Sequence, residues 1–108
     1  MAPRPAWQQD DCPVWCVAVH RDADHPDDRK HTSAIRVVPV IQLCASDPTG
    51  TDAPRTTELV VLLQRRDGAP DTWLYVGDGN EQSIEVTPEC WRRLVGQVSD
   101  VLAEVGVG

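Results

Sequence analysis

The C-terminal end of the chain carries its clearest pattern of apolar and polar positions. Between residues 91 and 105, apolar side chains recur at i, i+3, i+4 and i+7, the spacing that places them on one face of an α-helix. These residues are Trp91, Leu94, Val95, Val98, Val101, Leu102 and Val105. Thr87 is a suitable N-cap, Pro88 fits the first helical position, and Gly106 is a natural stop. The pattern predicts a helix over residues 88–105.

Four segments before this helix have the patterns of β-strands. They combine alternating or continuous apolar residues with turn-forming residues at their ends, and they cover residues 34–45, 57–66, 72–76 and 83–86. The apolar run at residues 59–63 predicts a central strand, because a strand covered on both faces has no polar side. Pro39 has no N–H to donate to a ladder, so the first strand is expected at an edge or with a bulge. Residues 46–56 are expected to form a loop.

These elements predict an α+β fold, in which a small antiparallel sheet of three to four strands packs on the one C-terminal helix. The helix and one face of the sheet are expected to bury each other. The opposite face, which carries Val38 and Val40, needs a cover from the N-terminal segment or from a second subunit. We expect a single domain over residues 12–108, with the sheet at residues 34–87, and a flexible tail at residues 1–11.

Charge and composition narrow the classes of partner. A chain of 108 residues with 41% hydrophobic residues is expected to fold around one modest core. Its net charge of −7 repels phosphate backbones, which disfavours nucleic acid as a partner. The pairs Arg65-Arg66 and Arg92-Arg93 are the only candidates for a local basic patch.

The four cysteines point to metal binding rather than to disulfides. The chain opens without an apolar signal segment, and no apolar run approaches the length of a membrane span, so a cytoplasmic protein without membrane contact is expected. Thiols stay reduced in the cytoplasm, and cysteines clustered with histidines are then typical of metal sites. Cys44 and Cys90 lie in a predicted strand and in the first helical turn, where they are expected to be small apolar fillers.

The remaining cysteines belong to a zinc segment at residues 12–33. Cys12, Cys16, His20 and His31 follow the spacing Cys-x3-Cys-x3-His-x10-His. Thiolate sulfur and imidazole nitrogen are the donors that tetrahedral Zn²⁺ selects, and two thiolates balance its charge. Four such donors close the coordination shell, so the pattern favours a structural zinc site over a catalytic one.

The fourth zinc ligand is the open point of this pattern. His25 is the rival of His31, although it lies in an acidic loop before Pro26 and is expected to be solvated. If neither histidine binds, the site opens to water, and Asp22, Asp24 or Asp28 becomes a candidate general base for hydrolysis. His-Glu-x-x-His and Gly-x-Ser-x-Gly motifs are absent from the sequence, which disfavours an enzyme.

Three segments resemble an uncharacterised family of small actinobacterial proteins. They are Cys12-Pro13-x-Trp15-Cys16 with His20 and His31, Val37-Val38-Pro39-Val40, and Val86-Thr87-Pro88-Glu89. The resemblance implies short strands, a C-terminal helix and zinc ligands at Cys12, Cys16, His20 and His31, and it implies no activity. The predominance of arginine over lysine, with Lys30 the only lysine, agrees with a GC-rich genome of that kind.

The sequence as a whole favours a small zinc-stabilised binding or regulatory module that acts through protein–protein contact. The alternatives are a small zinc-dependent hydrolase and a nucleic-acid-binding protein that uses its zinc segment. A protein partner is expected, and a second copy of the chain is one candidate for this partner.

Overall fold

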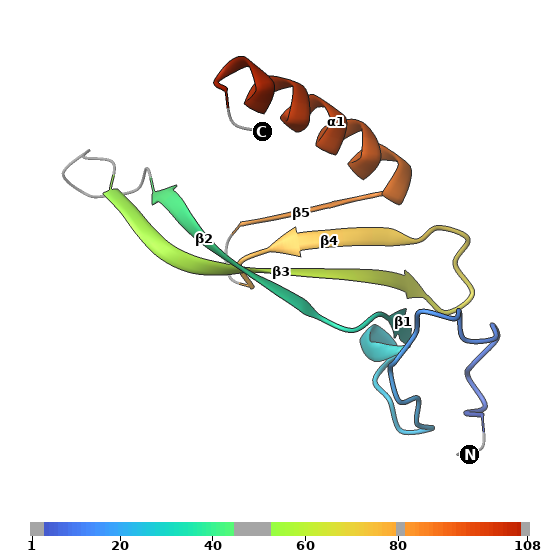
Figure 1. Cartoon of the computed structure of the whole chain (residues 1–108). Helices are drawn as coiled ribbons and strands as arrows, with labels where there is room; N and C mark the ends of the chain where they lie inside the picture. The colour runs from blue at the N-terminus through green and yellow to red at the C-terminus, as the bar shows by residue number, and fades with distance from the viewer. Residues whose placement is uncertain (1–3, 45–52, 80–81, 107–108) are drawn as a thin grey trace.

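An antiparallel sheet of five strands and one C-terminal helix make up the computed structural model, which describes residues 4–44, 53–79 and 82–106 (Figure 1). The elements are a short 3₁₀-helix η1 (Pro26–Asp28), β1 (Lys30–Thr32), β2 (Arg36–Cys44), β3 (Ala53–Arg66), β4 (Trp73–Gly77), β5 (Ser83–Val86) and α1 (Pro88–Glu104). The predicted α+β class is confirmed.

β3 is the strand to which most of the sheet is attached. It pairs with β1 and β2, which follow one another along one edge, and with β4 along the other edge. His31 of β1 lies opposite Arg65, and Leu63 lies opposite Leu74 of β4. Among the described residues, β5 pairs only with β4 and forms the outer edge of the order β1-β3-β4-β5. The apolar run at residues 59–63 therefore marks the central strand, as predicted.

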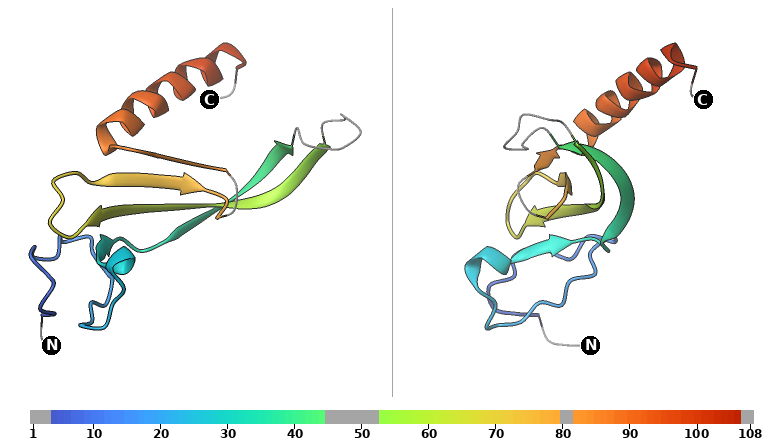
Figure 2. Two further views of the ribbon diagram at one scale, coloured as in Figure 1. Left: turned by 180° about the vertical axis from the view of Figure 1, so that it is seen from behind. Right: turned by 90° about the vertical axis from the view of Figure 1, so that its left-hand side faces the viewer.

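The first half of β3 forms a two-stranded ribbon with β2. β4 pairs with β3 only from Val60 onward, whereas β2 pairs with it back to Ala53. The ribbon curves away from the rest of the sheet (Figures 1 and 2). Pro39 lies on β2 opposite Glu58, and β2 has β3 as its only partner strand among the described residues, so the predicted edge position is confirmed.

The sheet has one strand more than the three to four predicted, and the additional strand is β1. This strand is three residues long and forms because it pairs with the end of β3, with Thr32 opposite Gln64. β3 also begins at Ala53, four residues before the predicted start, because pairing with β2 rather than burial extends it through polar residues. Of the predicted loop at residues 46–56, residues 46–52 lie outside the described part of the chain.

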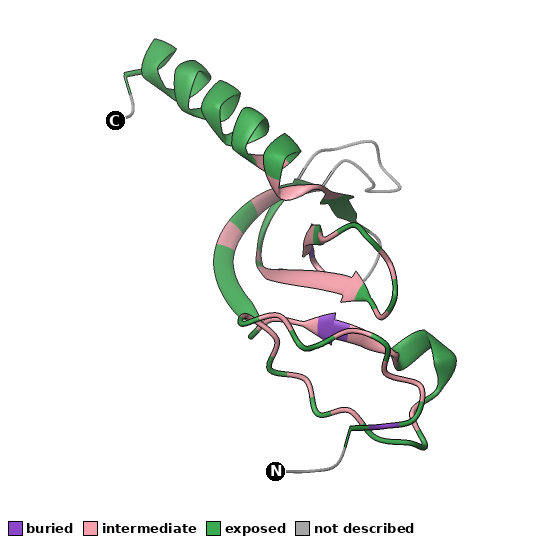
Figure 3. Ribbon diagram, turned by 90° about the vertical axis from the view of Figure 1, so that its right-hand side faces the viewer, coloured by how far each residue is buried: buried purple, intermediate pink, exposed green. Residues whose placement is uncertain are grey.

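The helix forms where the sequence predicts it, but it does not cover the sheet of its own chain. The Thr87 side chain accepts a hydrogen bond from the Cys90 N–H at 3.3 Å, which confirms the N-cap. Trp91 Nε1 donates to the Leu74 carbonyl of β4 at 2.7 Å and anchors the first turn. Beyond this anchor the apolar face is exposed, as Figure 3 shows, and Val98 retains 49% of its surface. None of the described helices is long and apolar enough to cross a lipid bilayer.

The expected mutual burial of helix and sheet was therefore wrong for a single chain. Only Thr87 separates β5 from α1, so β5 and the Trp91 anchor fix the direction in which the helix leaves the sheet. The radius of gyration is 17.9 Å, compared with about 13 Å for a compact domain of this length. No hydrophobic side chain of the described residues is buried, and His31 is the largest side chain with no exposed surface.

We predict that Trp91→Phe lowers the free energy of unfolding by about 1 kcal/mol, because it removes the hydrogen bond to the Leu74 carbonyl and keeps most of the ring. Urea denaturation followed by far-ultraviolet circular dichroism measures the change. Trp73→Phe is the matched control, because Trp73 is exposed and its indole has no hydrogen bond among the described residues. Equal stability losses in the two variants would contradict the anchor.

Candidate metal centre

Four side chains converge at the end of the sheet that carries β1. Cys12, Cys16, His20 and His31, here called the Cys/His cluster, each offer one ligand atom, and these atoms lie within 4.8 Å of one another. A tetrahedral site with bonds of about 2.0–2.3 Å has donor atoms about 3.3–3.8 Å apart. The distance from Cys16 Sγ to His20 Nε2 is already 3.7 Å. The cluster is thus close enough to hold a metal ion.

Short backbone contacts bring the cysteines to β1. The Cys16 N–H donates to the Pro13 carbonyl at 2.9 Å, which closes a turn between the two cysteines. The Val17 N–H donates to the Thr32 carbonyl at 2.9 Å, which ties the residue after Cys16 to the residue after His31. The spacing of cysteines and histidines therefore becomes a cluster through one turn and one contact with β1.

His31 is the most constrained member of the cluster. Its side chain has 0% exposed surface, and its Nε2 donates to Asp67 Oδ1 at 3.1 Å. Its Nδ1 is buried and has no hydrogen-bond partner within the described residues. A buried polar atom without a partner is costly, whereas a metal-bound histidine commonly donates its other N–H to a carboxylate. The Asp67 contact thus leaves Nδ1 as the ring atom available to a metal.

Asp67 also fastens the N-terminal segment to the turn after β3. Its carboxylate accepts the N–H of Gln9 at 2.6 Å and the N–H of Asp10 at 3.1 Å. In return, Asp10 Oδ2 accepts the N–H of Gly68 at 2.7 Å. Burial raises the pKa of Asp67, but the two backbone N–H groups and His31 outweigh it, so the pKa lies below its ordinary value. The carboxylate is therefore ionised and able to serve all three donors.

Trp7 covers the cluster from the N-terminal side. Its ring meets the His20 ring edge-on with centroids 5.5 Å apart, and its Nε1 donates to the Arg21 carbonyl at 2.7 Å. The Arg29 guanidinium lies 5.7 Å from the centroid of the Trp7 ring. Residues 1–11 are expected from the sequence to form a flexible tail. These contacts, with those of Gln9 and Asp10, attach the described part of that segment to the cluster.

The surroundings of Cys12 and His20 favour the neutral form of each side chain. Burial raises the pKa of the Cys12 thiol, and the neighbouring Cys16 raises it further. Burial lowers the pKa of His20, and His31 lowers it further. Two adjacent thiolates at this position therefore need a counter-charge, which a divalent cation supplies.

The other candidates from the sequence lie apart from the cluster. His25 caps η1 by accepting the Asp27 N–H at 3.1 Å, and 67% of its side chain is exposed. Asp22 accepts the N–H of Ala6, and Asp24 accepts the N–H of Arg21, so two of the three candidate bases are engaged with the backbone. The structure brings His31, and not His25, to the cysteines.

Two further cysteine predictions have different outcomes. Cys90 is exposed, so the expectation that it fills a gap in the core was wrong; the first helical turn lies outside any core in this chain. The side chain of Cys44 lies outside the described residues. Trp15 lines a pocket of about 510 Å³ together with Leu63 and Leu74 of the sheet.

Comparison with known proteins gives one match. A family model described as a domain of unknown function, DUF6907, covers residues 2–107. Searches of the curated proteins and of the solved structures gave no match to the chain. The matched range includes the entire Cys/His cluster, Asp67 and the helix.

We predict that Asp67→Asn lowers the free energy of unfolding by about 2 kcal/mol, because it removes the charge from three hydrogen bonds and turns an amide NH₂ toward an N–H donor. Chemical denaturation without added metal measures this effect separately from metal binding. Asp71→Asn removes the same charge at an exposed position nearby and is expected to change stability by less than about 0.5 kcal/mol. Similar values for the two variants would remove the role given to Asp67.

Proposed function

Because the chain belongs to the DUF6907 family, whose description carries no activity, we propose its function from its own structure: it is a small zinc-stabilised binding module that acts through protein–protein contact. The observation that carries this proposal is the convergence of four soft and borderline donors around His31, whose buried Nδ1 lacks a partner. The chain has no buried hydrophobic residue in its described part, so a metal that joins its segments has a large effect on stability.

The donor set supports Zn²⁺ as the metal. Two cysteine sulfurs and two histidine nitrogens complete a tetrahedral shell without a further ligand. Ca²⁺ and Mg²⁺ require oxygen donors, which the four-residue cluster does not offer. Two thiolates also neutralise Zn²⁺, so the ion enters a partly buried site without a net charge.

The closed shell supports a structural role over hydrolysis. A catalytic zinc keeps one position for water and has a general base nearby. Here four protein donors are available, and Asp67 is occupied by His31 and two backbone N–H groups. Zn²⁺ in this position joins the N-terminal segment to β1, and Asp67 joins both to the end of β3.

The charge pattern supports a protein partner rather than nucleic acid. The net charge is −7, and the paired arginines Arg65 and Arg66 lie 3.9 Å from Asp10 and 3.6 Å from Asp27. In contrast, large apolar side chains are exposed on the N-terminal segment, on β2 and on α1, including Val14, Ile41 and Val98. Extended apolar surface of this kind is typical of protein interaction sites.

We predict that the purified protein binds one Zn²⁺ per chain and that removal of zinc by a chelator lowers the melting temperature, because the ion holds segments that no hydrophobic core holds. Metal analysis and thermal denaturation measure the two effects. Cys16→Ala is expected to lose the zinc and the stability, whereas His25→Ala keeps both, since His25 lies outside the cluster. Full thermal stability in Cys16→Ala would refute the structural role.

We further predict that Co²⁺ substituted for zinc gives the intense visible bands of a four-coordinate site with two thiolates and two imidazoles. Added azide is expected to leave the spectrum unchanged, because a closed shell has no exchangeable water. A spectrum that changes on azide addition would instead indicate an open position and support the hydrolase alternative. His31→Ala serves as a reference, since it opens the fourth position deliberately.

A further inference from the structure

The chain exposes more surface than a folded monomer of its size. Its accessible surface is 8181 Å², whereas a compact monomer of 11.9 kDa has about 6,000 Å². The excess is about 2,200 Å² per chain, which falls within the roughly 1,000–2,500 Å² that each partner buries in obligate dimers. The excess surface of the single chain is thus as large as the surface that one subunit buries in an obligate dimer.

One part of this surface is the apolar face of α1. We call it the helix stripe, and it consists of Leu94, Val95, Val98, Val101, Leu102 and Val105, all of which are exposed. Their spacing is that of a face that packs against another element. The Trp91 anchor and the single residue between β5 and α1 hold the stripe clear of its own sheet.

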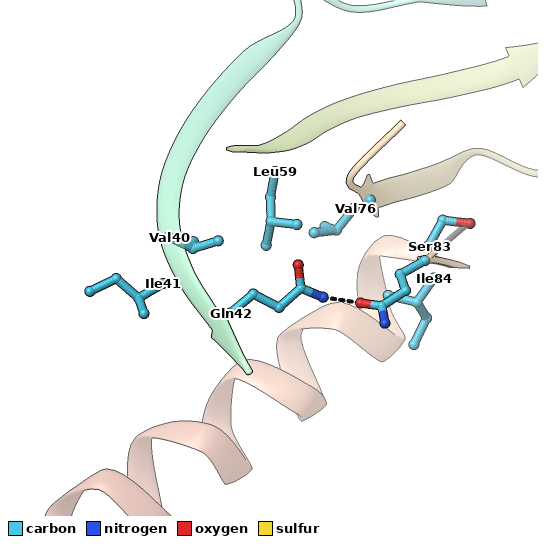
Figure 4. A pocket seen from close by; sticks show the side chains of 9 residues that line it. Val40, Ile41, Gln42, Leu59, Val76, Ser83 and Ile84 are labelled. Carbon is cyan, nitrogen blue, oxygen red and sulfur yellow. Dashed lines mark hydrogen bonds between the residues drawn. The ribbon is translucent and has the colours of Figure 1, made fainter. Parts of the chain in front are cut away.

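A second part is an apolar pocket of about 450 Å³ on the sheet, here called the sheet pocket (Figure 4). Val40 and Ile41 of β2, Leu59 of β3, Val76 of β4 and Ile84 of β5 supply its apolar lining. Gln42 donates a hydrogen bond to Gln82 at one side of it. No residue of α1 lines this pocket, so the helix of the same chain leaves it uncovered.

We propose that the helix stripe of one copy docks on the sheet pocket of a second copy of this chain, and that a two-fold axis repeats the contact in the opposite direction. This inference rests on the proposed role in protein contact and names the partner. In such an interface each copy contributes both a helix and an acceptor surface, so the two apolar surfaces are buried together.

A second copy accounts for the surfaces better than an unrelated partner does. Within one chain, the helix stripe has no apolar surface to pack against, and the sheet pocket has no helix to cover it. A two-fold exchange between two copies covers both surfaces. The stripe and the apolar lining carry no charged side chains, so their contact places no like charges against one another. The N-terminal segment and β1, which carry the Cys/His cluster, lie on the opposite side of the sheet from α1 (Figures 1 and 2), so the cluster stays outside the proposed interface.

Sedimentation equilibrium of the zinc-loaded full chain tests the proposal. The expected mass is about 24 kDa, twice the 11.9 kDa of one chain, at low micromolar concentration. Val98→Glu places a charge in the middle of the stripe and is expected to weaken dimerisation by about a hundredfold or more. Gln97→Glu makes the same change of charge on the polar face and is expected to remain dimeric. A monomeric wild type at tens of micromolar would overturn the inference, whether or not the variants fold.

Methyl-specific nuclear Overhauser spectra distinguish the exchange from other dimers. In a mixed sample, one copy carries labelled isoleucine methyls and the other carries labelled leucine and valine methyls. The expected contacts join Ile41 or Ile84 of one copy to Leu94 or Val98 of the other. A dimer without these contacts would refute the exchange. A second sample, in which one copy carries all three labels and is diluted with unlabelled copies, tests for contacts within one chain; their presence there would show that α1 closes on its own sheet and would overturn the proposal.

Metal analysis of the same samples separates this inference from the zinc proposal. A zinc-bound monomer would overturn the dimer and leave the zinc-stabilised module standing, with a different protein as its partner. A dimer without zinc would overturn the metal site and leave the exchange standing. The two outcomes are independent because the cluster and the stripe share no residue.

Discussion

The buried contact between His31 and Asp67 is the interaction on which the N-terminal half of the structure depends. His31 lies on a strand of only three residues, and Asp67 lies in the turn that follows β3. The same carboxylate accepts two N–H groups from the N-terminal segment. One side chain thus fixes three parts of the chain and also leaves His31 Nδ1 free for a metal. A metal-bound histidine commonly donates its other ring N–H to a carboxylate, and the Asp67 contact gives His31 this arrangement.

The described residues contain a polar network and apolar surfaces, but no hydrophobic core. The network lies around His31, and the apolar surfaces lie on α1 and on the curved ribbon of β2 and β3. Small domains that bury little apolar surface are commonly stabilised by a metal or by association. In the proposed assembly, zinc stabilises the side of the sheet that carries β1, and association with a second copy stabilises the side that carries α1.

The grouping of the Cys/His cluster was predictable because the chemistry of its side chains is distinctive and most of them lie close together in the sequence. Asp67 was not, since an aspartate before Gly68 is an ordinary turn residue and its role depends on how β1 pairs with β3. The sequence does not show that Trp7 packs against His20, because Trp7 lies in a proline-rich polar segment that resembles a tail. The choice of His31 over His25 likewise follows from the strand pairing, because both histidines fit the spacing requirement of a loop return.

The sequence by itself determined the helix and its cap, the central strand, the edge position of Pro39 and which cysteines and histidines come together. These features depend on local properties: side-chain chemistry, periodicity, and the missing N–H of proline. The tertiary structure alone decided that β1 exists, that Asp67 orients His31, and that α1 leaves the sheet uncovered. Each of these features depends on contacts between segments that are distant in the sequence. The free energy of such a contact depends on both segments together, so the residue pattern of one segment does not predict it.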